Sequence, residues 1–160
     1  MNTVTGSNNS AYYSLPASFG SSVVELDWTM KVVGSEGTFG WCSTVATGAH
    51  AYIMCFSTSS ITAYTFGSVP FDSSSAFHSY RMTVQEGGGM ALYVDGSASP
   101  IITGGNLANS TASQVWFGDG TGFGNADVLL VATPEPATWL SVGFALAGLV
   151  GLKRKLPSRV

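Results

Sequence analysis

The chain has 160 residues, and only 9% of them are charged, whereas a typical soluble domain carries about a quarter. Hydrophobic residues make up an ordinary 45%, so Ser, Thr, Gly and Asn take the place of the missing charged residues. This composition excludes a coiled coil, a bundle of charged helices and a highly charged disordered chain, and the net charge of −3 excludes a nucleic-acid binder. The length allows one domain with a sizeable core.

The charge is unevenly distributed along the chain. Residues 1–130 hold two basic and eight acidic side chains, a net charge of −6, whereas residues 131–160 hold four basic and one acidic, a net charge of +3. We therefore predict three parts: a body over residues 1–131, a linker over 132–136 and a tail over 137–160. Without the tail the body keeps about −6, which favours neutral glycans over polyanions as ligands.

The body shows short alternating apolar runs between Gly, Ser and Asn clusters, which indicates an all-β fold. Nine candidate strands in about 130 residues predict an antiparallel sandwich. The first ten residues have neither the basic cluster nor the apolar run of a secretion signal, so we expect the true start to lie upstream. The candidate strands are Ala11–Leu15, Val23–Val33, Thr38–Ala46, Ala51–Phe56, Ile61–Phe66, Phe77–Gln85, Met90–Val94, Gln114–Phe117 and Ala126–Val131.

The two cysteines, Cys42 and Cys55, lie on two of these strands, which a turn at Gly48-Ala49 would join. With a two-residue turn the cysteines face each other as a non-hydrogen-bonded pair, whose Cα atoms lie about 4.5 Å apart. That spacing suits a disulfide, and we predict one, with two free thiols in a β core as the alternative. The number and spacing of the cysteines exclude a zinc site and CxxC chemistry.

A second hairpin is expected around Gly87-Gly88-Gly89, with one apolar set on each strand directed at the core. The stretch Phe77–Gly96 resembles the central hairpin of the laminin-G-like, concanavalin-type jelly rolls, and Val115–Asp119 with Asp127-Val128 resembles the closing strands of that family. The resemblance covers Val23 to Val131 and implies a jelly-roll sandwich. The body is short for the family, which missing N-terminal strands would explain.

Some jelly rolls of this type hydrolyse glucans with a Glu-x-Asp-x-x-Glu motif on one strand. Here Glu25 and Asp27 begin that pattern, but Met30 stands where the acid/base glutamate would be and cannot donate its proton. His50 and His78 are the only histidines, one beside a turn and one at the start of a strand. We therefore predict that the body is not an enzyme, with a glycoside-active enzyme as the least favoured alternative.

A glycan-binding module is the more plausible function for the body. Such sites use aromatic faces with a few polar groups, and the same polar groups could contribute to a Ca²⁺ site, although these loops could supply only some of its six to eight oxygen ligands. No other cofactor is expected, and no metal site is assigned. The candidate ligand residues are Tyr93, Trp116, Asp119 and Asn125, and Tyr64 and Phe123 are further aromatic candidates.

The linker contains Pro134, Glu135 and Pro136, which form a stiff spacer. Sixteen uncharged residues, Ala137–Leu152, follow and predict a single apolar helix of roughly 24 Å. Lys153, Arg154 and Lys155 close it and are expected to stay on the cytoplasmic side of a membrane, with the body outside. A buried core helix is the alternative, but a core helix would be amphipathic and this one is apolar all round.

Together these three parts resemble the PEP-CTERM sorting signal of Gram-negative bacteria. The resemblance implies that an exosortase is the partner, that the helix anchors the chain transiently in the inner membrane, and that the body then reaches the cell surface or extracellular matrix. Family members tend to accompany exopolysaccharide production, so extracellular polysaccharide is a candidate ligand. A purely structural biofilm matrix protein without a specific ligand is the alternative.

Overall fold

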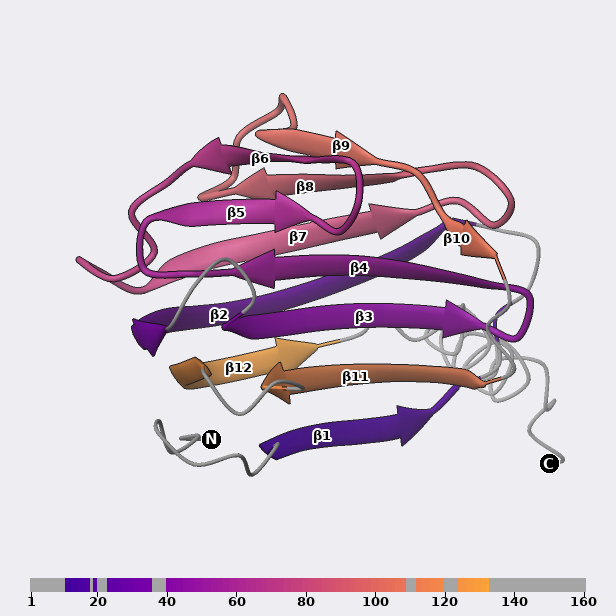
Figure 1. Cartoon of the computed structure of the whole chain (residues 1–160), viewed down its shortest axis with the longest axis horizontal. Coiled ribbons are helices and arrows are strands. Elements are labelled where there is room, and N and C mark those ends of the chain that lie inside the picture. Colours follow the sequence, from indigo (N-terminus) through magenta and orange to yellow (C-terminus); the bar gives the residue numbers. More distant parts are fainter. Residues whose placement is uncertain are drawn as a thin grey trace, which may run out of the picture.

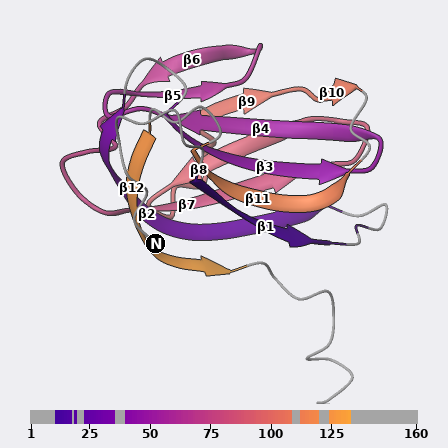
Figure 2. The same cartoon turned by 60° about the horizontal axis from the view of Figure 1, so that its bottom comes forward.

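A computed structural model describes residues 11–17, 19, 23–35, 40–108, 112–119 and 124–132. Every strand pairing in this part is antiparallel, and the strands form two sheets that pack face to face as layers (Figures 1 and 2). The predicted all-β sandwich is therefore confirmed. The predicted C-terminal helix lies outside the described residues, and within them no helix has the length and apolar character that a membrane span requires.

The larger sheet follows the order β1-β11-β3-β4-β5-β6, and β10 pairs with part of β4. The smaller sheet follows the order β12-β2-β7-β8-β9. The strands of the larger sheet are β1 (Ala11–Pro16), β3 (Trp41–Thr47), β4 (His50–Phe56), β5 (Ser60–Ala63), β6 (Gly67–Pro70), β10 (Leu107–Ala108) and β11 (Ser113–Asp119). Those of the smaller sheet are β2 (Val24–Ser35), β7 (His78–Val84), β8 (Met90–Val94), β9 (Ile102–Gly104) and β12 (Gly124–Ala132).

The β3–β4 hairpin has the register expected from its turn. Gly48 occupies the turn with φ +93°, a conformation that suits glycine. Cys42 faces Cys55 in this register, and the two form a disulfide. The side chains on the other face of the hairpin lie in the core, each at most 1% exposed: Trp41, Val45, Tyr52, Met54 and Phe56.

The β7–β8 hairpin likewise directs its alternate side chains inward, as the sequence pattern predicts. Val84 pairs with Met90 across the glycine turn. The Tyr52 hydroxyl donates to the Gln85 carbonyl and accepts a bond from the Gly87 amide, both at 2.9 Å, so a core tyrosine of the larger sheet fixes this turn. The inward set is Tyr80, Met82, Val84, Met90, Leu92 and Val94, all buried.

Three short strands were not among the sequence-based expectations: β6, β9 and β10. The run Ile61–Phe66, expected as one strand, is instead β5 followed by a turn. The turn closes through a 2.8 Å bond from the Phe66 amide to the Ala63 carbonyl, with Thr65 at φ +66°. The β-branched and aromatic composition of the run favours a strand, but this turn reverses the chain so that β6 can extend the sheet edge.

Candidate functional site

The structure separates the aromatic residues expected to bind a ligand. Tyr93 lies on the outer face of the smaller sheet, and Arg81 stacks over its ring at 4.4 Å, which occupies one ring face. Trp116 alternates with the buried Val115 and Phe117 and so faces outward from the larger sheet. The two aromatic residues therefore lie on opposite faces of the sandwich. Asp119 and Asn125, whose side chains lie outside the described part, belong to β11 and β12.

The carboxylates of the incomplete hydrolase motif also face outward. Glu25 and Asp27 alternate along β2 with buried residues, and Met30 is fully buried in the core. Burial and the nearby Glu25 raise the pKa of Asp27, and Arg81 on the neighbouring strand partly offsets this rise. Glu25 and Asp27 therefore have no third carboxylate at the motif's last position on β2, where the core residue Met30 stands.

Each of the two histidines makes a hydrogen-bond contact with a carboxylate from a neighbouring turn. His50 Nδ1 lies 2.7 Å from Glu86 Oε1, and hydrogen bonds from Thr47 and His50 lower the pKa of Glu86. His78 Nδ1 lies 2.7 Å from Asp95 Oδ2. Partial burial would raise the pKa of Asp95, but the bonds from His78 and the Ser79 amide outweigh it and lower the pKa.

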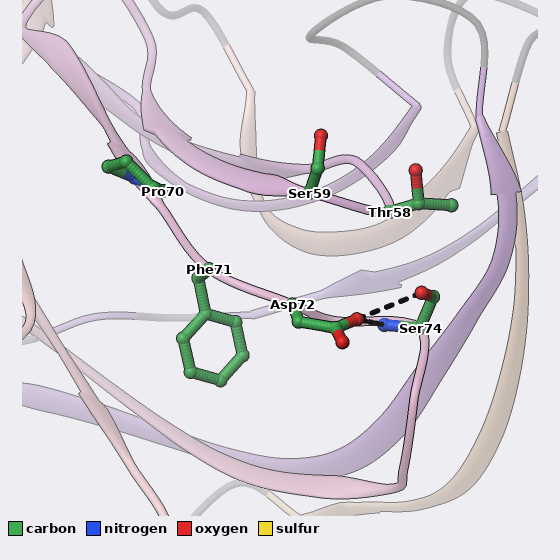
Figure 3. Close-up of a pocket in the computed structure, with 6 residues that line it drawn as sticks. All are labelled: Thr58, Ser59, Pro70, Phe71, Asp72 and Ser74. Atoms are coloured by element: carbon green, nitrogen blue, oxygen red, sulfur yellow. Dashed lines mark hydrogen bonds between the residues drawn. The ribbon is translucent and has the colours of Figure 1, made fainter.

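A concavity in the described part lies at one end of the larger sheet (Figure 3). It is a shallow, open hollow of about 540 Å³ between the β4–β5 turn and the chain that follows β6. Backbone bonds hold these two segments together: the Phe71 amide donates to Ser59 and the Ser73 amide donates to Thr58. The lining residues are Thr58, Ser59, Pro70, Phe71, Asp72 and Ser74.

Asp72 is the charged group of this hollow. Its Oδ1 accepts bonds from the Ser74 amide and hydroxyl, both at 2.9 Å, and from the Ser75 amide at 3.1 Å. These bonds lower the pKa of Asp72 to about 2, so the carboxylate stays ionised at any physiological pH. Within the described residues all of its bonds go to Oδ1, which leaves Oδ2 for an external hydroxyl or water.

Phe71, next to Asp72 in the chain, is the first of a series of ring contacts that leads to the core. The Phe71 ring points away from the Thr58–Ser59 turn in Figure 3 and packs on His78, with ring centroids 4.8 Å apart. His78 in turn contacts the buried Tyr80. The hollow therefore combines one fixed anion with hydroxyl side chains from two loops, a set of groups that can accept and donate bonds to a neutral polar ligand.

Sequence reasoning did not single out this hollow. The run Asp72-Ser73-Ser74-Ser75 carries the only local signal, because an aspartate followed two and three residues later by backbone donors forms an Asx turn. The Asp72 turn lies beside Thr58 and Ser59 only because β5 pairs with β6, and β6 was not predicted.

Comparisons with known proteins identify the tail and the fold. Residues 132–155 match the family model for the PEP-CTERM protein-sorting motif. The fold resembles that of sheep galectin-11, solved in complex with glycerol, with a TM-score of 0.51, 9% identity, and coverage of 76% of this chain and 96% of that one. No curated protein matches the sequence.

Two further structures are similar at lower scores. The galectin LEC-6 of Caenorhabditis elegans gives a TM-score of 0.48 at 9% identity, covering 80% of this chain and 94% of that one. An uncharacterised protein of Mycobacterium paratuberculosis gives 0.47 at 13% identity, covering 76% and 73%. The body is thus a galectin- and concanavalin-like jelly roll, and the chain carries a PEP-CTERM motif that marks it as an extracellular protein sorted by an exosortase at the membrane.

Proposed function

We propose that this chain is a non-catalytic surface or matrix protein of a Gram-negative bacterium whose jelly-roll body binds neutral glycans. In this proposal an exosortase recognises Pro134, Glu135 and Pro136 while the apolar tail anchors the chain transiently in the inner membrane. The basic cluster at Lys153–Lys155 stays on the cytoplasmic side, and the body is transferred to the cell surface or matrix. The match of residues 132–155 to the sorting motif is the observation that carries the proposal.

A binding role suits the polar groups of the body better than catalysis does. Asp72 holds a turn, and Glu86 and Asp95 each pair with a histidine, so each of these carboxylates has a structural task. None of them is a free acid poised near neutral pH, as a general acid would be. A matrix protein without a specific ligand is the second candidate, supported by the shallowness of the hollow.

Neutral glycans are the ligand class that the hollow and the charge favour. The second oxygen of Asp72 can accept bonds from sugar hydroxyls, and Ser74 lies beside it. The fixed charge of Asp72 and the net charge of −6 in residues 1–130 both repel uronic acids and sulfated sugars.

Replacing Pro134, Glu135 and Pro136 with alanines is expected to abolish processing and release in a host that carries an exosortase. The helix and basic cluster remain in this variant, so the chain should accumulate in the membrane fraction at its unprocessed size, measured by immunoblotting of membrane and medium. Ser158→Ala, in the same tail but outside the matched residues 132–155, is the control and should be processed normally. Release of the triple variant at the normal rate would refute exosortase sorting.

Asp72→Asn is expected to weaken binding of neutral oligosaccharides to the processed, released protein by about 10-fold or more. Asn keeps the oxygen that holds the turn but loses the charge, and a hydrogen bond to a charged group is worth roughly 1.5–3 kcal/mol. Titration calorimetry at pH 5 and pH 8 should give the same wild-type affinity, because a group with a pKa of about 2 does not titrate there.

Glu25→Gln, on the outer face of the other sheet, is the matched control and should leave affinity unchanged. Alginate oligosaccharides should bind more weakly than neutral ones. If the released protein binds no glycan of either kind, the purely structural matrix role replaces the binding role.

A further inference from the structure

The turn between β5 and β6 holds a conformation that its sequence does not favour. The Phe66 amide bonds to the Ala63 carbonyl, which places Thr65 third in the turn with φ +66°. Gly or Asn normally fills that position, and a β-branched residue there is an outlier. Such strain tends to persist where a site requires it.

The residue that ends the strained turn, Phe66, packs its ring against the backbone of two glycines. The Phe66 side chain is 46% exposed. Its ring rests on the chain just after β9, where a Cβ added to Gly105 would lie only 2.7 Å from the ring, and one added to Gly104 would lie 3.4 Å from it. Any side chain at position 105 would therefore displace Phe66. The ring is supported by backbone on one side and open to solvent on the other.

The exposed ring and the Asp72 hollow lie at the two ends of one edge strand. β6 starts directly after Phe66 and ends at Pro70, which lines the hollow (Figure 1). Four residues of extended chain span roughly 13 Å. Between the two ends Ser68 is exposed, and its hydroxyl lies 2.7 Å from that of Thr62 on β5. The exposed Ser68 thus lies on the strand between the exposed ring of Phe66 and the carboxylate of Asp72.

We propose that a neutral polysaccharide chain lies along β6, with one sugar at Asp72 and another stacked on Phe66. This rests on the proposed function and adds that the ligand is a chain, recognised at two points, rather than a single sugar. The apolar face of a sugar ring suits the open face of Phe66, and its hydroxyls suit Ser68 and Asp72. Addition of a protein strand to this edge is disfavoured because β6 is short and ends in proline.

Titration of the processed, released protein with neutral β-1,3- and β-1,4-glucan oligosaccharides of increasing length tests this inference. Affinity is expected to rise with length until the oligosaccharide reaches Phe66, and then to level off. Phe66→Ala should weaken binding of the long oligosaccharides by roughly tenfold and leave the shortest ones unchanged, because only the long ones reach the ring. Asp72→Asn should weaken binding at every length.

Two further variants separate stacking from folding. Phe66→Tyr keeps an aromatic ring and should restore long-chain affinity, and Gly105→Ala should mimic Phe66→Ala by displacing the ring. Tyr93→Ala, on the other sheet, should leave the affinity for oligosaccharides of every length unchanged. Equal affinity at all lengths, or equal weakening at all lengths by Phe66→Ala, would overturn the two-point inference and leave binding at Asp72 standing. A wild-type protein that binds no oligosaccharide would overturn both.

Discussion

Trp28→Ala is expected to lower the free energy of unfolding by about 3–5 kcal/mol, the usual cost of removing a large buried aromatic side chain. Trp28 is 2% exposed and stacks on Tyr80 of its own sheet, with ring centroids 5.5 Å apart. It also makes edge contacts with Phe56 at 5.8 Å and Phe117 at 5.9 Å, both in the opposite sheet. Because this one ring contacts both layers, its loss opens a cavity between the sheets.

Urea unfolding of the processed protein, followed by circular dichroism, measures this loss. Trp28→Phe should cost less than the alanine variant, since it retains a ring, and the buried indole nitrogen has no hydrogen-bond partner within the described residues. Tyr93→Ala is the surface control and should cost about 1 kcal/mol or less, the value of an exposed cation–π contact. A loss below 1 kcal/mol for Trp28→Ala would show that the two sheets do not depend on this ring.

Sequence reasoning located the hairpins well where a glycine turn fixed their register. Once Gly48-Ala49 is a two-residue turn, the period of two along each strand determines every cross-strand pair, including Cys42 with Cys55. Around the second glycine turn the same period predicted that one apolar set on each strand faces the core, and the structure pairs Met82 with Leu92 within these sets. In both hairpins the information is local, so a single sequence contains it.

The β5–β6 edge and the hollow were not predictable in this way. Thr65 and Phe66 have the composition of a strand, and the contact of Phe66 with Gly105, some forty residues away, cannot be read from that composition. The hollow depends on two loops that meet through this unpredicted hairpin. The aromatic candidates Tyr93 and Trp116 are both half-buried, and their placement on opposite faces depends on which sheet each strand joins.

Cys42→Ser combined with Cys55→Ser is expected to lower the free energy of unfolding by about 3 kcal/mol. The disulfide joins cysteines at a sequence separation of 13, and a cross-link that closes a loop of about that size removes this much chain entropy from the unfolded state. Both cysteines are at least 95% buried, so the serine hydroxyls add a smaller cost for burial without partners. The hairpin register should persist in the folded variant, because the turn at Gly48 and the core side chains also specify it.

The measurement is urea unfolding of the double variant and of the wild type, both without reductant. Unfolding of the wild type in excess reductant is the control, because it breaks the disulfide without introducing serines. Reduced wild type should lose about the same stability as the double variant. Equal stability of oxidised wild type and double variant would show that the cross-link contributes nothing to the fold. The disulfide forms only in an oxidising compartment, such as the one that an exported chain reaches. A body made in a reducing cytoplasm should therefore be less stable than the oxidised protein by the same amount as the double variant.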